Sequence, residues 1–138
     1  MKAAIRYYTK SGNAKHLADA IAQALGIGAK EVGVPLEEPG ELLFLCNSVY
    51  WAGVDAKVKQ FISDNKAKIG TLVNVSTAAL TESSYPQIKK LCGELGVSVS
   101  EAEFHCRGSF KFMHKGKPDS GDLAAVKAFA ERVTGGAG

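Results

Sequence analysis

The segment at residues 3–25, AAIRYYTKSGNAKHLADAIAQAL, carries the clearest structural signal in the sequence. Residues 3–8 have the composition of a β-strand, and from Ala14 onward the apolar positions recur at helical spacing. Gly26 marks the expected end of that helix. A short polar loop at residues 9–13 joins the strand to the helix. A strand that enters a helix in this way predicts the first unit of an α/β fold.

The same alternation of strands and helices continues along the rest of the chain. Further strands are expected at residues 29–34, 41–46, 72–75 and 97–106, and further helices begin near Val54, Tyr85 and Ser120. The run at 41–46 is continuously apolar, as in a strand covered on both faces, whereas the polar strand at 29–34 suits a sheet edge. Five strands and four helices in alternation predict a doubly wound parallel sheet with helices on both faces.

Length and composition indicate a single domain. The chain has 138 residues, of which 46% are hydrophobic and 22% charged. We expect the domain to span residues 1–134 and a flexible Gly-rich tail to follow at 135–138. No apolar run reaches the ~18 residues that a membrane-spanning helix needs, and the N-terminus lacks the pattern of a signal peptide. The expectation is therefore a soluble, cytoplasmic protein.

Charge and cysteine content exclude some classes of function. Seventeen Lys and Arg against fourteen Asp and Glu give a net charge of +3, too small a surplus to indicate nucleic-acid binding. Cys46, Cys92 and Cys106 lack the paired spacing of a zinc site or of a redox motif, so we expect reduced, mostly buried thiols. His105 and Cys106 are neighbours on an expected strand, so they point to opposite faces and cannot bind one metal ion.

The loop after the first strand has the composition of an anion site. It consists of Thr9, Lys10, Ser11, Gly12 and Asn13, and leads through Ala14 into the first helix. Backbone N–H groups and the helix dipole favour an anion at such a helix start, and ligands of doubly wound sheets bind at this edge. The alternative is that Ser11 or Asn13 only caps the helix. The sequence contains neither G-x-G-x-x-G nor G-x-x-x-x-G-K-[ST], which excludes those two nucleotide-binding motifs as written.

The loops expected after the third and fourth strands combine aromatic and small polar residues. The first is Asn47, Ser48, Val49, Tyr50, Trp51, Ala52 and Gly53, and the second begins with Ser76, Thr77, Ala78 and Ala79. An aromatic side chain beside a glycine can cover a flat ring, and such stacking contributes about 0.5–1.5 kcal/mol. The alternatives are that Trp51 fills the core and that the second loop is an ordinary surface loop. Together the three loops describe a site for a mononucleotide with a flat ring.

These residues resemble the flavodoxin family. The phosphate loop of that family has the pattern [T/S]-x-[T/S]-G-x-[T/S] directly after the first strand, and Thr9, Ser11, Gly12 and Asn13 match its spacing. The last position is Ala14 instead of a hydroxyl residue. The resemblance extends over almost the whole chain, at the length of the short-chain members. It implies an α/β flavodoxin-like three-layer sandwich, with a five-stranded parallel sheet of order 2-1-3-4-5.

The resemblance also implies non-covalent FMN as the cofactor. The implied phosphate contacts come from the side chains of Thr9, Ser11 and Asn13 and from the amides of residues 10–14, with added charge from Lys10. Trp51 or Tyr50 would cover one face of the ring, in the loop of Ser48, Val49, Ala52 and Gly53. Backbone groups of Ser76, Thr77 and Ala78, in the loop with Ala79, would meet the pyrimidine end.

As a function, the resemblance implies a flavoprotein of electron transport. It would carry electrons between redox partner proteins as a monomer, without catalytic residues, a metal, nucleic acid or a membrane, because the flavin itself carries the redox chemistry. Two alternatives stay open. One is an FMN-dependent NAD(P)H oxidoreductase that reduces a quinone or a similar acceptor, and the other is a flavodoxin-fold module with weak flavin binding.

A basic and aromatic segment follows the fifth expected strand. It contains Lys111, His114, Lys115 and Lys117 among Phe110, Phe112 and Met113. One interpretation is a solvated loop at the sheet edge. The other is a docking patch for an acidic redox partner, which would distinguish this chain from the acidic carriers that it resembles.

Overall fold

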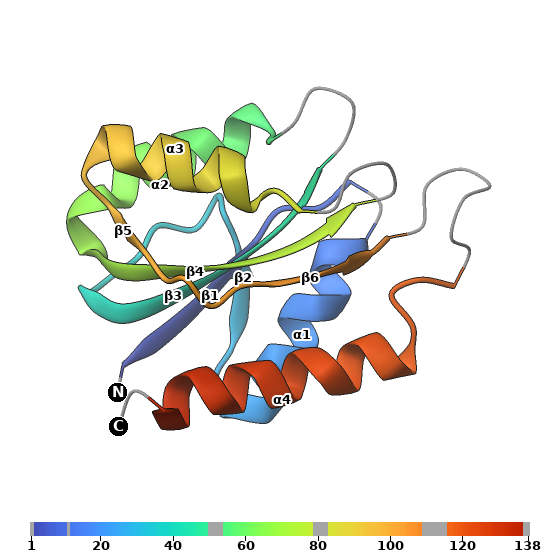
Figure 1. The fold of residues 1–138 in the computed structure, drawn as a ribbon. Helices are drawn as coiled ribbons and strands as arrows, with labels where there is room; N and C mark the ends of the chain where they lie inside the picture. The colour runs from blue at the N-terminus through green and yellow to red at the C-terminus, as the bar shows by residue number, and fades with distance from the viewer. Residues whose placement is uncertain (1, 11, 50–53, 79–82, 109–115, 137–138) are drawn as a thin grey trace.

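A computed structural model of the protein describes residues 2–10, 12–49, 54–78, 83–108 and 116–136, and these form one sheet with helices on both sides (Figure 1). The elements in chain order are β1 (Ala3–Tyr7), α1 (Asn13–Leu25), β2 (Ala29–Glu31), β3 (Gly40–Val49), α2 (Ala56–Asn65), the 3-10 turn η1 (Lys66–Lys68), β4 (Ile69–Ala78), α3 (Tyr85–Leu95), β5 (Ser98–Val99), β6 (Phe104–Arg107) and α4 (Ser120–Gly136).

The sheet is parallel throughout, and its order is β2-β1-β3-β4-β5, with β6 also pairing with β4. This confirms the predicted order and the parallel arrangement. The apolar β3 lies between β1 and β4, and the three-residue β2 lies at an edge, as the composition of the two strands indicates.

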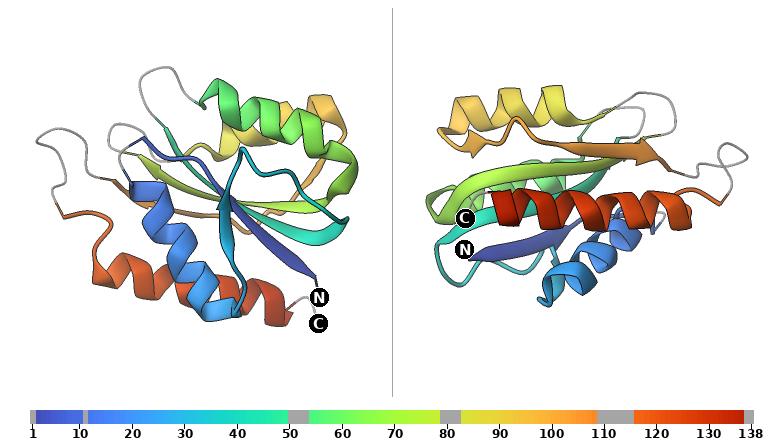
Figure 2. Two further views of the ribbon diagram at one scale, coloured as in Figure 1. Left: turned by 180° about the vertical axis from the view of Figure 1, so that it is seen from behind. Right: turned by 60° about the horizontal axis from the view of Figure 1, so that its bottom comes forward.

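Each face of the sheet has its own hydrophobic core. On one face, Ile5, Phe44 and Val75 pack against α1 and α4. On the other face, Leu45 and Leu72 belong to the core that α2 and α3 cover. Figure 2 shows the sheet between the two helix layers. The arrangement is the predicted three-layer sandwich.

Besides β1, which ends one residue early at Tyr7, three strands differ in length from the prediction. β2 ends at Glu31 rather than at residue 34, whereas β3 continues to Val49 and β4 to Ala78. Residues 76–78 pair with residues 47–49 of β3 and with residues 105–107 of β6. Strand pairing therefore includes residues that the sequence pattern assigned to loops.

The prediction of one continuous strand at 97–106 is wrong, because the chain forms two short strands, β5 and β6. At the break, Ser100 Oγ accepts a hydrogen bond from the backbone N–H of Ala102 at 3.1 Å, and the Ser100 carbonyl accepts one from the Tyr85 hydroxyl at 3.2 Å. A serine side chain that bonds its own backbone in this way competes with ladder pairing. The apolar and polar alternation continues across the break and conceals it in the sequence.

Helix α4 begins at Ser120, as predicted, and packs along α1. Val126 and Ala130 are fully buried, and Phe129 is buried as well. The helix includes residues 135 and 136, which extends it two residues into the segment expected to be a tail. Among the described residues, no helix has both the length and the apolar character to cross a bilayer.

Candidate functional site

The candidate site lies where β1, β3, β4 and β6 end, because parallel strands place their carboxyl ends at one edge of the sheet (Figure 1). The end of β1 leads through Thr9 and Lys10 to the start of α1. Six of the residues predicted for cofactor binding lie outside the described part of the chain: Ser11, Tyr50, Trp51, Ala52, Gly53 and Ala79. The described part of the chain also leaves out residues 110–115 of the basic segment.

The loop after β1 brings backbone amides to the start of α1. Gly12 is the N-cap residue, with a left-handed φ of 90°, and its N–H donates to Thr9 Oγ1 at 2.7 Å. Gly is suited to this position because a Cβ is strained at such a φ. The first intrahelical bond runs from the N–H of His16 to the carbonyl of Gly12 at 3.1 Å. The amides of residues 13–15 therefore precede the intrahelical ladder and face the end of the helix.

The interpretation of Asn13 as a side-chain cap is wrong. Helix α1 begins at Asn13, its cap position is held by Gly12, and the cap makes no side-chain hydrogen bond. Asn13 is 5% exposed. Ala14, which replaces the hydroxyl residue of the flavodoxin pattern, is fully buried in the core shared with Leu17 and Ala18. Ala14 can therefore offer the site its backbone N–H and no side-chain donor.

Lys10 joins the loop after β1 to the start of α2. Its Nζ lies 3.4 Å from Asp55 Oδ2, and Asp55 Oδ1 accepts from the backbone N–H of Lys57 at 2.9 Å. The Lys57 N–H, and more weakly Lys10, lower the pKa of the Asp55 carboxyl, against the opposing effect of partial burial. The charge that Lys10 brings to the loop is therefore partly balanced by Asp55.

The assignment of Ser48, Ser76, Thr77 and Ala78 to loops is wrong, because all four lie in β3 or β4 and are buried. The Ser48 and Thr77 hydroxyls lie 2.7 Å apart and bond each other. Ser76 Oγ lies 3.3 Å from Ser83 Oγ and accepts from the backbone N–H of Ser84 at 3.3 Å. These hydroxyls hold the strand ends together and thereby fix where the following segments begin. Val49 is also a strand residue, at the end of β3.

Sequence reasoning missed a closed ring of hydrogen bonds under this edge. Asn47 Nδ2 donates to Asn74 Oδ1 at 2.8 Å, Asn74 Nδ2 donates to Ser84 Oγ at 2.9 Å, and Ser84 Oγ donates to Asn47 Oδ1 at 2.6 Å. All three residues are fully buried. Ser84 occupies the N-cap position of α3, but its hydroxyl joins this ring and does not cap the helix. In the sequence, this network is indicated by Asn74, a polar residue inside an otherwise apolar strand.

A second polar chain extends from this edge to β6. Ser83 Oγ donates to Glu103 Oε2 at 3.0 Å, and Glu103 Oε1 lies 2.7 Å from His105 Nδ1. His105 is exposed, whereas Cys106 packs against the α1 and α4 core, which confirms that the two point to opposite faces. Among the described residues, no group of three or more His, Cys, Asp or Glu side chains could hold a metal ion.

Gly108 was also missed. It follows β6, and a Cβ placed on it would lie 2.6 Å from Asn13 Nδ2 and 3.0 Å from Thr77 Cβ. Three segments far apart in sequence therefore meet here without space for a methyl group. A single glycine in a sequence carries no signal of such a meeting point.

The three cysteines are free, with Cys46 and Cys92 buried and Cys106 half-buried, which confirms the prediction of mostly buried thiols. Burial raises the pKa of Cys92 to about 11 and that of Cys106 to about 12, and it raises the pKa of Cys46 strongly as well. Thiols with such pKa values stay protonated at neutral pH and are poor nucleophiles.

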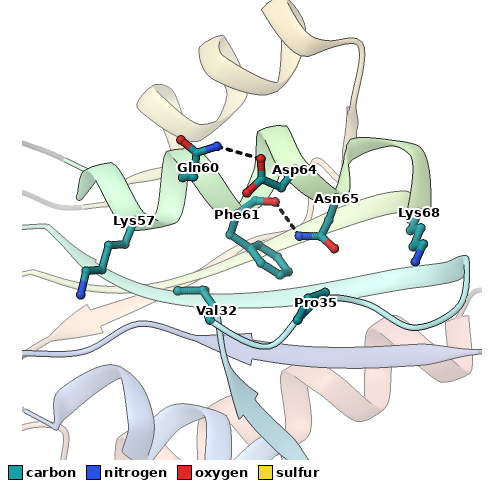
Figure 3. A pocket seen from close by; sticks show the side chains of 9 residues that line it. Val32, Pro35, Lys57, Gln60, Phe61, Asp64, Asn65 and Lys68 are labelled. Atoms are coloured by element: carbon teal, nitrogen blue, oxygen red, sulfur yellow. Dashed lines mark hydrogen bonds between the residues drawn. The ribbon is translucent and has the colours of Figure 1, made fainter.

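A separate groove of about 550 Å³ runs along α2 beside the chain that follows β2. Figure 3 shows the Phe61 ring pointing from α2 toward Val32 and Pro35, while Gln60 and Asp64 bond each other on the helix. None of the residues predicted for cofactor binding lines this groove. The groove is therefore distinct from the site at the carboxyl edge.

Comparison with solved structures identifies the fold as flavodoxin-like. A flavodoxin from the domain Archaea superposes with a TM-score of 0.79 at 17% identity, over 99% of this chain and 98% of that one. A short-chain flavodoxin associated with a non-canonical PDU bacterial microcompartment gives 0.73 at 15% identity, over the full length of both chains. At this level of identity the likeness establishes the fold.

The same fold also occurs as part of larger proteins. Rubredoxin oxygen:oxidoreductase from Desulfovibrio gigas matches 98% of this chain with 35% of its own length, at a TM-score of 0.74 and 10% identity. No protein-family model matches the sequence, and no curated protein matches it either.

Proposed function

We propose that this protein binds FMN non-covalently at the carboxyl edge of the sheet and transfers electrons between redox partner proteins. The observation that carries the proposal is the start of α1, where a left-handed Gly12 turns the amides of residues 13–15 toward the edge at which β1 and β3 end. Two full-length structural neighbours are named as flavodoxins, which supports the assignment of the ligand as a flavin.

The phosphate end of the site fits FMN by its chemistry. The helix start supplies N–H donors and the positive end of the α1 dipole, both of which favour a dianionic phosphate. Thr9 Oγ1 accepts the Gly12 N–H at 2.7 Å, so its own proton is directed elsewhere and can be donated to a phosphate oxygen. Lys10 adds a positive charge, and Asp55 restrains it 3.4 Å away.

The ring end of the site consists of the segments after β3 and β4. We assign the ring-covering role to Tyr50 or Trp51, with Gly53 near the reactive edge of the ring, and the pyrimidine end to the backbone that follows Ala78. When bound, FMN supplies the chemistry of one-electron and hydride transfer. The protein would hold the flavin ring between the segments that follow β3 and β4. The hydrogen bonds among Asn47, Asn74 and Ser84 fix the strand ends from which these two segments start.

The redox partner in this proposal carries an acidic surface. The net charge of +3 favours association with acidic proteins, and such attraction mainly raises the association rate. In the described part of the basic segment, Lys117 bonds Asp119 at 3.0 Å and Asp122 at 2.8 Å. Lys111 and Lys115 are therefore the residues assigned to the docking patch. Replacing both with Glu should slow electron transfer most at low salt, and an unchanged, salt-independent rate contradicts the patch.

The binding part of the proposal is tested by titrating FMN with apoprotein and following the quenching of flavin fluorescence. The informative variant is Gly12→Ala, because a Cβ at a φ of 90° costs about 1–2 kcal/mol and disturbs the helix start. Gly26→Ala is its matched control, since Gly26 has a φ of 69° and lies at the opposite end of α1. We expect Gly12→Ala to weaken FMN binding and Gly26→Ala to leave it unchanged.

The three functions make different predictions for the loaded protein. A carrier takes up electrons in two separate one-electron steps with resolved potentials and passes them to another redox protein. Direct oxidation of NAD(P)H at a substantial rate instead indicates an oxidoreductase. Wild-type protein that does not quench FMN fluorescence contradicts the proposal and leaves the flavodoxin-fold module.

A further inference from the structure

We propose that Gly108 is a positioning residue of the phosphate loop: by leaving space for the Asn13 amide, it determines how strongly the site prefers FMN to riboflavin. The inference rests on the proposed function, because it concerns the same site. It adds a residue that lies outside the three predicted binding loops and that binds no ligand group itself.

The backbone of Gly108 is held in place by the sheet. Gly108 is buried at the end of β6, and its N–H donates to the carbonyl of Ala78 in β4 at 3.3 Å. On its other side lie Asn13 and Thr77. A Cβ on Gly108 would lie 2.6 Å from Asn13 Nδ2, and 3.0 and 3.1 Å from Thr77 Cβ and Oγ1. A carbon atom at 2.6 Å forces one of these neighbours to move.

The Asn13 amide is the neighbour that yields. Thr77 belongs to β4, which pairs with β3 on one side and β6 on the other, and its hydroxyl is tied to Ser48 at 2.7 Å. The contact on the other side is with the far end of the Asn13 side chain, whose torsions can change more easily than the backbone of a strand that is paired on both sides. Alanine at 108 therefore displaces the Asn13 amide and leaves the sheet in place.

This displacement affects one part of the ligand. Asn13 stands at the start of α1, directly after Gly12, and its backbone N–H is the first of the amides that would receive the phosphate. Riboflavin has the same ring as FMN but no phosphate. A change that acts through Asn13 must therefore weaken FMN binding and spare riboflavin binding, whereas general loosening of the protein weakens both.

The experiment compares the dissociation constants of FMN and riboflavin by fluorescence quenching in wild type and Gly108→Ala. We expect FMN binding to weaken about tenfold or more, because the displaced Asn13 disturbs the helix start that would receive the phosphate, and riboflavin binding to weaken less than about threefold. Gly93→Ala in α3 is the control, because a Cβ there meets no atom within 4 Å. It should change neither constant. An equal loss for both flavins overturns the inference.

A double-mutant cycle tests the route through Asn13. In an Asn13→Ala background the amide is absent, so Gly108→Ala has nothing to displace and should change FMN affinity by less than about twofold. This background also relieves the tightest contact, which keeps the comparison valid if Gly108→Ala alone folds poorly. Independent, additive losses show that Gly108 acts by another route and overturn the inference.

Inorganic phosphate separates this inference from the proposed function. We expect phosphate to raise the thermal unfolding midpoint of the wild-type apoprotein and to raise that of Gly108→Ala much less. If wild type fails to bind FMN but shows this phosphate response and loses it in Gly108→Ala, the proposed function is wrong, and Gly108 still positions the loop that binds the phosphate. An equal phosphate response in both proteins overturns the role of Gly108 even where FMN binds tightly.

Discussion

The two halves of β3 and β4 are chemically opposite, although the residues that distinguish them are equally buried. In the first half, the fully buried apolar residues include Phe44, which belongs to one core, and Leu45 and Leu72, which belong to the other. In the second half, Asn47 and Asn74 are also fully buried, and they bond each other. The strands therefore change from core to polar network along their length, toward the edge that carries the candidate site.

This difference separates stability from positioning. Burying apolar surface stabilises the fold by about 25 cal/mol per Å², whereas a buried polar group contributes little net stability and costs free energy when it loses its partner. Among the described residues, no buried side-chain N or O atom lacks a hydrogen-bond partner. The carboxyl half is thus fully satisfied, and its value lies in holding the segments that follow the strands.

The largest expected effect is in the apolar half. Phe44→Ala should lower the free energy of unfolding by about 3–5 kcal/mol, because it removes a fully buried ring and leaves a cavity. Urea denaturation measures the loss. Val34→Ala is the control, since Val34 is 38% exposed and should change stability by less than about 0.5 kcal/mol. Similar losses of unfolding free energy in the two variants would contradict the assignment of stability to the apolar half of the strands.

A smaller effect is expected in the polar ring. Asn47→Leu removes both the donor to Asn74 Oδ1 and the acceptor of the Ser84 hydroxyl, and should cost about 1–3 kcal/mol. Replacing Asn47 and Asn74 with Leu and Ser84 with Ala removes all three side chains of the ring and should recover most of that loss. Flavin quenching measured on the triple variant should nevertheless weaken. If the triple variant recovers stability and binds flavin like wild type, the ring has no positioning role.

The hydroxyl pair on the other face should matter less. Thr77→Val keeps the side-chain shape and removes the bond to Ser48, at a cost of about 1 kcal/mol by thermal or urea unfolding. Thr71→Val is the matched control, because Thr71 is half-buried at the other end of the same strand. Equal costs at the two positions would show that the Ser48–Thr77 bond adds nothing specific.

The smallest effect concerns Asp55 and depends on pH. The pKa of its carboxyl is lowered in the folded protein, so the resulting stability is present above the ordinary Asp range near about pH 4 and is lost as the pH falls through the lowered folded value. Asp55→Asn keeps a good N-cap and removes the charge. Wild type should exceed this variant in stability at pH 7 by less than about 1 kcal/mol, and the difference should vanish in acid. A difference that grows in acid has the opposite sign and excludes the ion pair as its cause.

The strands and the loop that starts α1 could be predicted because their signals are local, whereas the strand order followed from the resemblance to flavodoxins. Apolar blocks such as residues 41–46 identify central strands, and small polar residues before α1 identify a helix start. The burial of Asn47 and Ser48 could not be predicted, since it depends on Asn74 and Thr77 in another strand. The partners in each pair are about thirty residues apart in the sequence, and the spacing of apolar residues within one segment does not indicate such contacts.

Gly108 and the break in the fifth strand were missed for the same reason. The space around Gly108 is set by Asn13 and Thr77, which come from two other segments. The break at Ser100 depends on a contact with Tyr85 of α3. Sequence pattern reports what each segment prefers by itself, and these features arise only where segments meet.

The break between β5 and β6 also bears on how the fold can lengthen during evolution. Leu72 pairs with Val99 and Val75 pairs with Phe104, so the β5–β6 side contains two more residues than β4 over the same span. Residues 100–103 belong to neither strand, so the faces of β6 are set by its own pairing with β4 and not by the number of residues before it. Further residues could be inserted at this point, and Phe104 and Cys106 would still face the same core.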